Sequence, residues 1–290
     1  MSLRGRVPWW LKIGLKMAWS RLPLPHRLWH RLGVFRHGAM QSPDYAFAVV
    51  ARHLGLAGLR PPLTGMTVLE FGPGDSLFGA VIARGLGAER TWLIDAGPFA
   101  VEDPAAYRDM AAFLAAKGWA PPDLGTARDL EDVLRACGAT YLTGGLASLA
   151  RIPDASVDFA WSQAVLEHVR KDEFDATLRE LRRVLKPGGV ASHRVDLRDH
   201  LADALNSLRF AEARWESPLF VDSGFYTNRI RLSDMRVAFA AAGFAVEVAG
   251  VERWDALPTP RRALAPPFRD MSEDDLRVRG FDVLLRREDG

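Results

Sequence analysis

Hydrophobic positions along the chain change their spacing near residue 60. Before that point they recur at helical intervals, which predicts an amphipathic helix at 7–22, ended by Pro23 and Pro25, and a second helix at 43–58. Beyond it, short apolar runs alternate with helical segments. The runs predict strands at 66–71, 91–95, 140–144, 157–163, 190–197, 244–254 and 281–288. The helices between them are expected at 76–87, 102–117, 129–136, 164–169, 171–186 and 232–243, the last with Ser233 as its N-cap.

Strands that alternate with helices predict an α/β fold with a mostly parallel, Rossmann-like sheet and right-handed crossovers. Residues 198–230 have no clear period and follow the fifth predicted strand, so they are expected to form an insertion. We therefore predict a basic helical arm or lid at residues 1–60 and one large α/β domain at residues 61–290.

Composition narrows the class of protein. The chain has 290 residues, of which 48% are hydrophobic and 26% charged, a balance typical of a globular protein. Cys137 is the only cysteine, so no disulfide can form within the chain, which fits a reducing cytoplasm. The sequence shows neither an apolar run of about 18 residues nor a signal peptide. We therefore expect a cytoplasmic protein.

The net charge of +2 conceals an uneven distribution. Residues 1–43 hold eight basic residues and no acidic one, whereas the remainder holds 30 basic and 36 acidic residues. Three interpretations of this arm stay open. It could be a lid helix over the site, an amphipathic helix on an anionic membrane through residues 1–22, or a nucleic-acid contact with interleaved tryptophans.

The segment VLEFGPGDS (68–76) ends the first predicted strand and opens a helix. Gly72 and Gly74 allow a sharp turn, and the free N–H groups of the helix that follows can face a ligand. Asp95 ends the second strand, where a carboxylate can accept hydrogen bonds from both ribose hydroxyls. The turn lacks the Gly-Lys-Ser/Thr of a phosphate loop.

Four segments, VLEFGPGDS, LID, IPDASVDFAWSQAVLEHV and LRRVLKPGGVASHRVDL, together resemble the class I S-adenosylmethionine-dependent methyltransferases. The resemblance implies a seven-stranded sheet with a reversed final strand, a cap at 198–230 and S-adenosyl-L-methionine as cofactor. It places Glu70, Gly72 and Gly74 at the methionine and ribose, Asp95 at the ribose hydroxyls, and Ser162 and Gln163 below the sulfonium. Ser76 replaces the family's third glycine, and Leu146 replaces the acid that usually meets adenine. Adenine is then expected to be held by apolar contact and backbone groups near Leu146 and Ala147.

The stretch SHRVDLRDH (192–200) runs off the fifth strand toward the expected site. It has three interpretations: His200 or His193 as a general base beside Asp196, a metal site, or structural packing. The metal site would use Glu167, His168, His193 and His200. The first acid of the related Glu-x-x-Glu-His pattern is here Ala164, and we therefore assign no metal ligand.

The expected function is methyl transfer from S-adenosylmethionine to a small molecule or glycan, at an oxygen atom. Polar residues of the cap could contact such an acceptor: Tyr226, Asn228, Arg229 and Arg231. Two alternatives remain, a non-catalytic partner protein at the membrane surface and a nucleic-acid methyltransferase. The Asn/Asp-Pro-Pro-Tyr/Phe motif of many amino-directed nucleic-acid enzymes does not occur.

Overall fold

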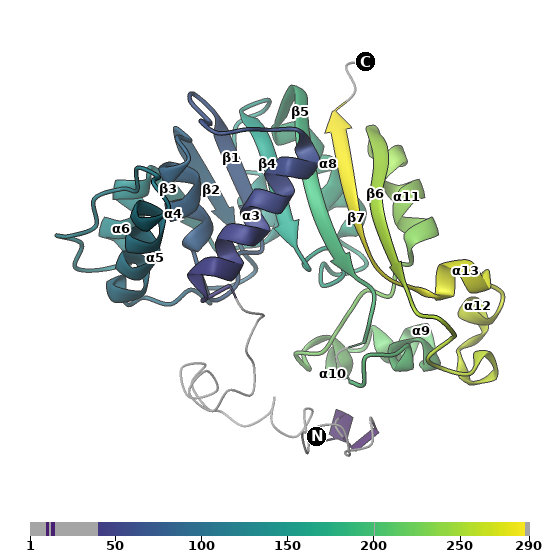
Figure 1. The fold of residues 1–290 in the computed structure, drawn as a ribbon. Coiled ribbons are helices and arrows are strands. Elements are labelled where there is room, and N and C mark those ends of the chain that lie inside the picture. Colours follow the sequence, from purple (N-terminus) through teal and green to yellow (C-terminus); the bar gives the residue numbers. More distant parts are fainter. Residues whose placement is uncertain (1–9, 12, 15–39, 200, 288–290) are drawn as a thin grey trace.

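A seven-stranded sheet forms the centre of the molecule, in the order β3-β2-β1-β4-β5-β7-β6 (Figure 1). The computed structural model describes residues 10–11, 13–14, 40–199 and 201–287. The first five strands run parallel, and β7 is antiparallel to both of its neighbours. The predicted fold class is thereby confirmed. The strands are β1 (Thr67–Phe71), β2 (Arg90–Ile94), β3 (Ala139–Leu142), β4 (Val157–Gln163), β5 (Leu185–Asp196), β6 (Phe244–Arg253) and β7 (Val278–Arg287).

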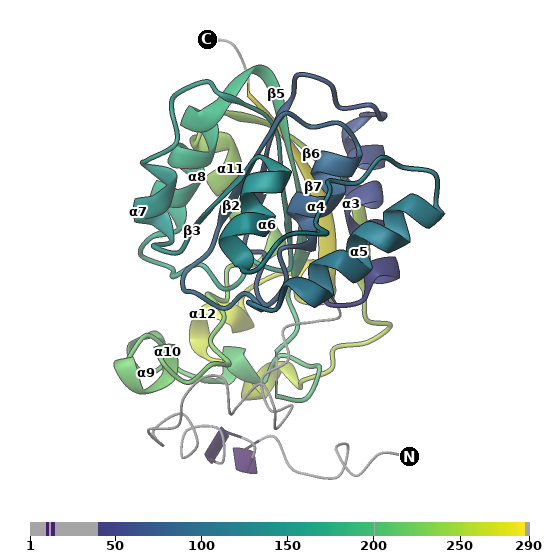
Figure 2. The same cartoon turned by 90° about the vertical axis from the view of Figure 1, so that its left-hand side faces the viewer.

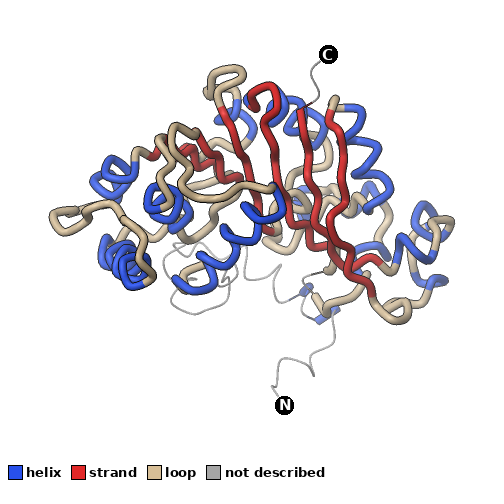
Figure 3. Tube along the Cα trace, turned by 45° about the horizontal axis from the view of Figure 1, so that its top comes forward, coloured by secondary structure: helices blue, strands red, loops and turns tan. Residues whose placement is uncertain are grey.

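Helices cover both faces of this sheet (Figures 2 and 3). One face carries α3 (Pro43–Ala57), α4 (Phe78–Gly85) and α5 (Pro104–Ala116), with α6 (Leu130–Cys137) beside β3. The other face carries α7 (Leu146–Leu149), α8 (Phe174–Val184) and α11 (Leu232–Ala241). Each face has its own hydrophobic core, because alternate side chains of the central strands point to opposite sides.

The ends of several helices follow from local sequence. Gly58 ends α3 and Gly138 ends α6, both with a positive φ that a residue with a side chain rarely adopts. Asp103 and Asp129 cap the N-termini of α5 and α6, where each carboxylate accepts a backbone N–H. These local rules explain why the predicted boundaries of these helices lie close to the observed ones.

Three local predictions were wrong. Residues 164–169 form turns instead of a helix, because Ala164 has a left-handed φ of 56° and the side chain of Asn228 binds two carbonyls of the segment. Strand β5 begins at Leu185, five residues earlier than expected, with a register shift opposite β4 that accommodates the glycines. Helix α11 begins at Leu232, so Ser233 is not its N-cap. The Ser233 hydroxyl instead donates a hydrogen bond to Asp275.

The segment after β5 lies beyond the carboxyl ends of the parallel strands (Figure 1). It contains the 3-10 helix η2 (Asn206–Arg209) and the short helices α9 (Glu212–Trp215) and α10 (Pro218–Val221). Trp215, Phe220, Phe225 and Tyr226 form its aromatic core, into which Ile13 of the N-terminal arm is also buried. On the same side, η3 (Arg261–Ala263), α12 (Pro266–Arg269) and α13 (Glu273–Leu276) precede β7.

Most of residues 1–43, including all eight basic residues of that range, lies outside the described residues. The described part of the chain has no helix that is long and apolar enough to cross a bilayer. Helix α3 packs on β5 and α4, although the sequence assigned it to the arm. The division at residue 60 and the limits of the cap stay predictions.

Candidate cofactor site and active site

The glycine turn after β1 is bound to the neighbouring strand and loop. Gly72 and Gly74 have φ values of 76° and 66°. The Gly72 amide donates to the Ile94 carbonyl oxygen over 2.7 Å, and the Gly74 amide donates to Asp95 Oδ2 over 2.7 Å. An ideal Cβ on Gly72 would lie 2.4 Å from a methyl carbon of Val165, so this position has no room for a side chain.

Asp95 at the end of β2 is held by backbone groups from two directions. Its Oδ1 accepts the Ala96 amide at 2.7 Å, while its Oδ2 accepts that of Gly74. Its carbonyl oxygen accepts the Gly145 amide at 2.8 Å, which brings the loop after β3 alongside. The carboxylate direction is therefore fixed at the carboxyl edge of the sheet.

A hollow of about 710 Å³ opens beside this group. One wall is the loops after β2 and β3, and the other is the first half of α8. Its lining residues are Ala96, Gly144, Gly145, Leu146, Ala147, Ala150, Glu173, Ala176, Arg179 and Glu180. Leu146, expected near adenine, thus lies in a cavity that adjoins Asp95.

Glu70 is buried under α4 instead of pointing into the hollow. Its Oε2 occupies the space that a side chain on Gly79 would fill, next to the ring of Trp161. Burial, together with the nearby charge of Asp95, raises the pKa of Glu70 to about 8. The carboxyl group is therefore mostly protonated at neutral pH, and its predicted contact with the cofactor stays a prediction.

The end of β4 places Ser162 and Gln163 on opposite faces of the sheet. The Ser162 hydroxyl lies 2.7 Å from Nδ1 of His193 on β5. Gln163 Oε1 lies 3.2 Å from His53 Nε2 on α3, and His53 Nδ1 lies 2.8 Å from the Ser192 hydroxyl. Burial disfavours the charged imidazolium, so the pKa of His53 falls to about 4 and that of His193 to about 3.

Comparison with family models gives one match, in which residues 121–192 align with a methyltransferase domain. This segment contains β3, β4, α8 and most of β5, in a sheet with the order 3-2-1-4-5-7-6. The matched segment and the sheet order together identify a methyltransferase domain with the class I fold. No curated protein matches its sequence.

Solved structures of other methyltransferases are similar to this one at low sequence identity. A methyltransferase from Mesorhizobium loti has 20% identity and a TM-score of 0.45, with 85% of this chain and 100% of that chain covered. One from Methanosarcina mazei has 16% identity and a TM-score of 0.48, covering 82% and 96%. A phosphoethanolamine N-methyltransferase from Haemonchus contortus has 14% identity and a TM-score of 0.46, covering 85% and 53%. These values are too low to indicate the acceptor of this chain.

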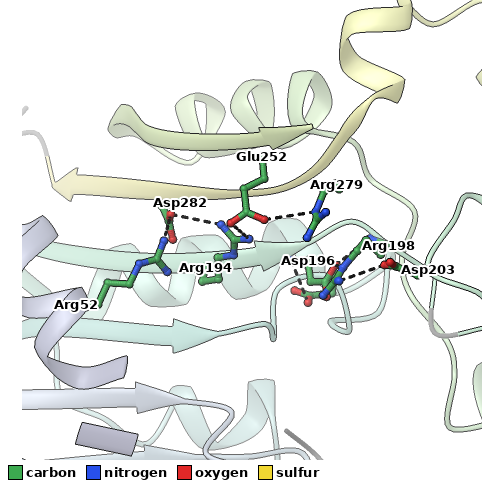
Figure 4. Close-up of polar contacts among 9 residues, drawn as sticks. Arg52, Arg194, Asp196, Arg198, Asp203, Glu252, Arg279 and Asp282 are labelled. Carbon is green, nitrogen blue, oxygen red and sulfur yellow. Dashed lines mark hydrogen bonds and ion pairs between the residues drawn. The ribbon is translucent and has the colours of Figure 1, made fainter. Parts of the chain in front are cut away.

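The polar stretch at the end of β5 is engaged in contacts within the methyltransferase. Asp196 accepts two hydrogen bonds from the Arg198 guanidinium group, at 2.8 and 2.7 Å, and this group also pairs with Asp203 (Figure 4). Asp199 accepts backbone amides of the cap, including Leu201 and Ala202. His193 is fully buried, and His200 lies outside the described residues.

Of the four residues considered for the alternative metal site, the structure describes Glu167, His168 and His193. Glu167 accepts the Asp196 amide at 3.1 Å, while His168 Nδ1 lies 2.9 Å from the Tyr226 carbonyl oxygen. Burial raises the pKa of Glu167 to about 8. In the part of the chain that the structure describes, no three His, Cys, Asp or Glu side chains are arranged to hold a metal ion.

The cap residues expected to contact an acceptor are used within the fold. Arg231 donates to the carbonyl oxygens of Leu197, Asp275, Leu276 and Val278. The Arg229 guanidinium lies between the rings of Trp215 and Phe268, 5.3 Å from each centroid, and donates to Phe210 O at 2.7 Å. Arg229 thus connects parts of the cap, while Arg231 connects the end of β5 with α13 and the start of β7. The sequence alone could not separate these structural roles from acceptor binding.

Two residues of the site were missed by the sequence analysis. His53 was assigned to the arm, although it binds Gln163 and Ser192 from the far side of the sheet. Val165 covers Gly72 from a segment that was predicted to be helical. Both contacts join residues about a hundred positions apart, and no local pattern marks them.

The residues present fit the cofactor that the family uses. Asp95 presents a fixed carboxylate, the two glycines leave backbone space, and the adjoining hollow has apolar groups at Leu146 and Ala147. When bound, S-adenosylmethionine supplies the methyl group on its sulfonium.

Proposed function

We propose that this methyltransferase binds S-adenosylmethionine along the glycine turn, Asp95 and the adjoining hollow, and methylates an oxygen of a small molecule or glycan. The Asp95 geometry is the main support. A carboxylate with both oxygens already oriented by the amides of Gly74 and Ala96 can accept the two ribose hydroxyls without rearrangement. Leu146 and Ala147 would contact adenine, and Ser162 and Gln163 would support the sulfonium end.

The charge of the cap favours a small acceptor over a nucleic acid. Residues 198–230 contain four arginines and five acidic residues. Of the arginines, Arg229 is buried and Arg198 is paired with Asp196 and Asp203. A nucleic-acid surface needs unpaired positive charge to neutralise phosphates, and the described cap offers little of it.

The catalytic assignments remain proposals. His200 stays the proposed general base, since in the sequence it follows Asp196 and Asp199 in the polar stretch after β5. His193 is neutral and enclosed, which suits orientation of Ser162 better than proton transfer from an acceptor. Asp196, paired with Arg198, would shape the same edge.

The function can be tested with S-adenosylmethionine labelled at its methyl group and fractionated cell extract. We expect label to enter a low-molecular-mass or glycan fraction, and His200→Asn to lower the rate by about 10²–10⁴ without loss of cofactor binding. Glu131→Gln, on the exposed face of α6, serves as the control. Label in nucleic acid would support a nucleic-acid methyltransferase instead. Binding of S-adenosylhomocysteine without methyl transfer to any fraction would support a non-catalytic partner protein. A full rate for His200→Asn would remove His200 as the base.

A further inference from the structure

A set of hydrogen bonds joins the loop after β4 to the end of the cap. The Asn228 amide donates to the Glu167 carbonyl oxygen at 2.7 Å. Its side-chain Nδ2 donates to the carbonyl oxygens of Leu166 at 2.8 Å and Val169 at 3.0 Å, and its Oδ1 accepts the Ile230 amide at 3.1 Å. The side chain is fully buried, and its amide group takes the place of the helical hydrogen bonds that residues 164–169 do not form.

Neighbouring contacts extend this connection into the aromatic core of the cap. His168 Nδ1 donates to the Tyr226 carbonyl oxygen over 2.9 Å, and the Lys171 amide donates to the Tyr226 hydroxyl over 3.2 Å. The indole of Trp215 donates to the Thr227 carbonyl oxygen over 2.7 Å. Residues 226–228 are thus held between the aromatic core and the loop.

The same loop contacts the glycine turn on its other side. Val165 fills the space over Gly72, where its two methyl carbons lie 2.4 and 2.5 Å from the position of an ideal Cβ. Ala164 has a φ of 56°, and its amide donates to the Arg194 carbonyl oxygen at 2.8 Å. A residue with a side chain keeps such a backbone only where its surroundings enforce it. Here the surroundings are β5 on one side and the contacts of Asn228 on the other.

We propose that Asn228 is a positioning residue for methyl transfer. It holds residues 166–169 so that Val165 packs over Gly72. Through these contacts the cap and the glycine turn are coupled, so that a change in one affects the other. The inference rests on the proposed cofactor site at Gly72, Gly74 and Asp95. Its consequence is that a substitution in the cap, away from any cofactor contact, changes the affinity for the cofactor.

The test measures S-adenosylhomocysteine binding by calorimetry and the melting temperature for each variant. Asn228→Ala should raise Kd about tenfold or more, because two buried carbonyl groups lose their donor and the loop moves away from Gly72. Asn206→Ala is the matched control, since Asn206 is also a buried cap residue but its Oδ1 accepts from Arg209 within the cap. It should change the melting temperature while Kd stays within about twofold.

Val165→Ala tests the last contact without touching the cap, and remains informative if Asn228→Ala does not fold. It should also raise Kd for S-adenosylhomocysteine, by about three- to tenfold, with a small change in melting temperature. Wild-type affinity in both Val165→Ala and a folded Asn228→Ala would overturn the inference, as would an equal loss in Asn206→Ala. If the wild-type protein binds no S-adenosylhomocysteine, the proposed cofactor site fails and the inference fails with it. Wild-type binding that no variant weakens would overturn the inference alone.

Discussion

Asp95 is the residue whose replacement tests the cofactor site most directly. Asp95→Asn keeps the shape of the side chain but removes its charge and one acceptor oxygen, so one of the two backbone amides loses its partner. We expect binding of S-adenosylhomocysteine to weaken by about 1.5–3 kcal/mol, the range for hydrogen bonds to a charged group. Calorimetry at a pH near 7 measures the difference.

Asp103→Asn is the matched control at this scale, because Asp103 also accepts a backbone amide, that of Ala105, but caps the exposed start of α5. It should leave the affinity unchanged and cost at most about 1 kcal/mol of stability. Equal affinities of the Asp95 variant and the wild-type protein would exclude the assigned ribose contact.

At the scale of elements, the packing of α4 on the sheet depends on a helical glycine. An ideal Cβ on Gly79 would lie 1.9 Å from Glu70 Oε2 and 3.2 Å from the ring of Trp161. Gly79→Ala should therefore push α4 away from β1 and β4 and lower the free energy of unfolding by about 1–3 kcal/mol. Chemical denaturation followed by circular dichroism measures this change.

Gly55 in α3 provides the opposite case, because a Cβ there would meet nothing within 4 Å. Gly55→Ala should stabilise the protein by about 0.5–1 kcal/mol, since alanine favours the helix and loses less backbone entropy on folding. If Gly79→Ala stabilises the protein as Gly55→Ala does, then α4 does not pack as closely against Glu70 as the structure shows.

At the scale of the whole molecule, four buried titratable groups set the pH range of stability. His53 and His193 have pKa values lowered to about 4 and 3, so below pH 6.5 the unfolded chain binds protons that the native state does not. Stability through these two groups rises with pH up to about 6.5. Glu70 and Glu167 have pKa values raised to about 8, so the native state binds protons that the unfolded chain has lost, and stability through them falls between about pH 4.5 and 8.

The two pairs oppose each other between about pH 4.5 and 6.5, so their net effect appears outside that window. We expect stability to fall below pH 4.5 through the histidines and above pH 6.5 through the glutamates. Glu70→Gln should remove the Glu70 contribution to the pH dependence. The free energy of unfolding of this variant, relative to the wild-type protein, should therefore increase as the pH rises from 5 to 8, by at most about 1.4 kcal/mol per pH unit.

The control for this prediction is Glu131→Gln, on the exposed face of α6, which should show no such trend. Denaturant unfolding across this range is the measurement, and parallel curves for wild-type and Glu70→Gln would contradict the burial of a protonated Glu70.

Ion pairs link the antiparallel end of the sheet to α3, again over long stretches of sequence. Asp282 on β7 pairs with Arg52 of α3 and with Arg194 of β5, and Arg194 also pairs with Glu252 of β6 (Figure 4). Helix α3 is therefore attached to the sheet by charge as well as by its apolar face. The sequence marks Arg52 only as one polar position of an amphipathic helix, and so gives no reason to place it on the methyltransferase domain.

The sequence by itself determined the seven strands and most of the longer helices along the chain, the glycine turn and the acid after β2. These features depend on hydrophobic periodicity and on backbone preferences that act over a few residues, so they can be predicted from the local sequence without knowledge of the fold. The family resemblance added the reversed β7, which the structure confirms. The role of the basic arm and the identity of the base at His200 stay predictions.

Tertiary structure alone decided how the polar residues are used. Asn228, Arg229 and Arg231 have the side chains of a substrate site, yet buried carbonyl groups of distant segments take up their donors. His53 and Glu70 are ionisable residues by sequence. Only their burial among distant side chains keeps Glu70 mostly protonated near pH 7 and keeps His53 neutral at pH values well below 6.5. The physical reason is common to all of them. The role of a hydrogen-bond donor and the charge of a titratable group depend on its partners and on its exposure to water. Both are set by contacts between residues that lie far apart in the chain.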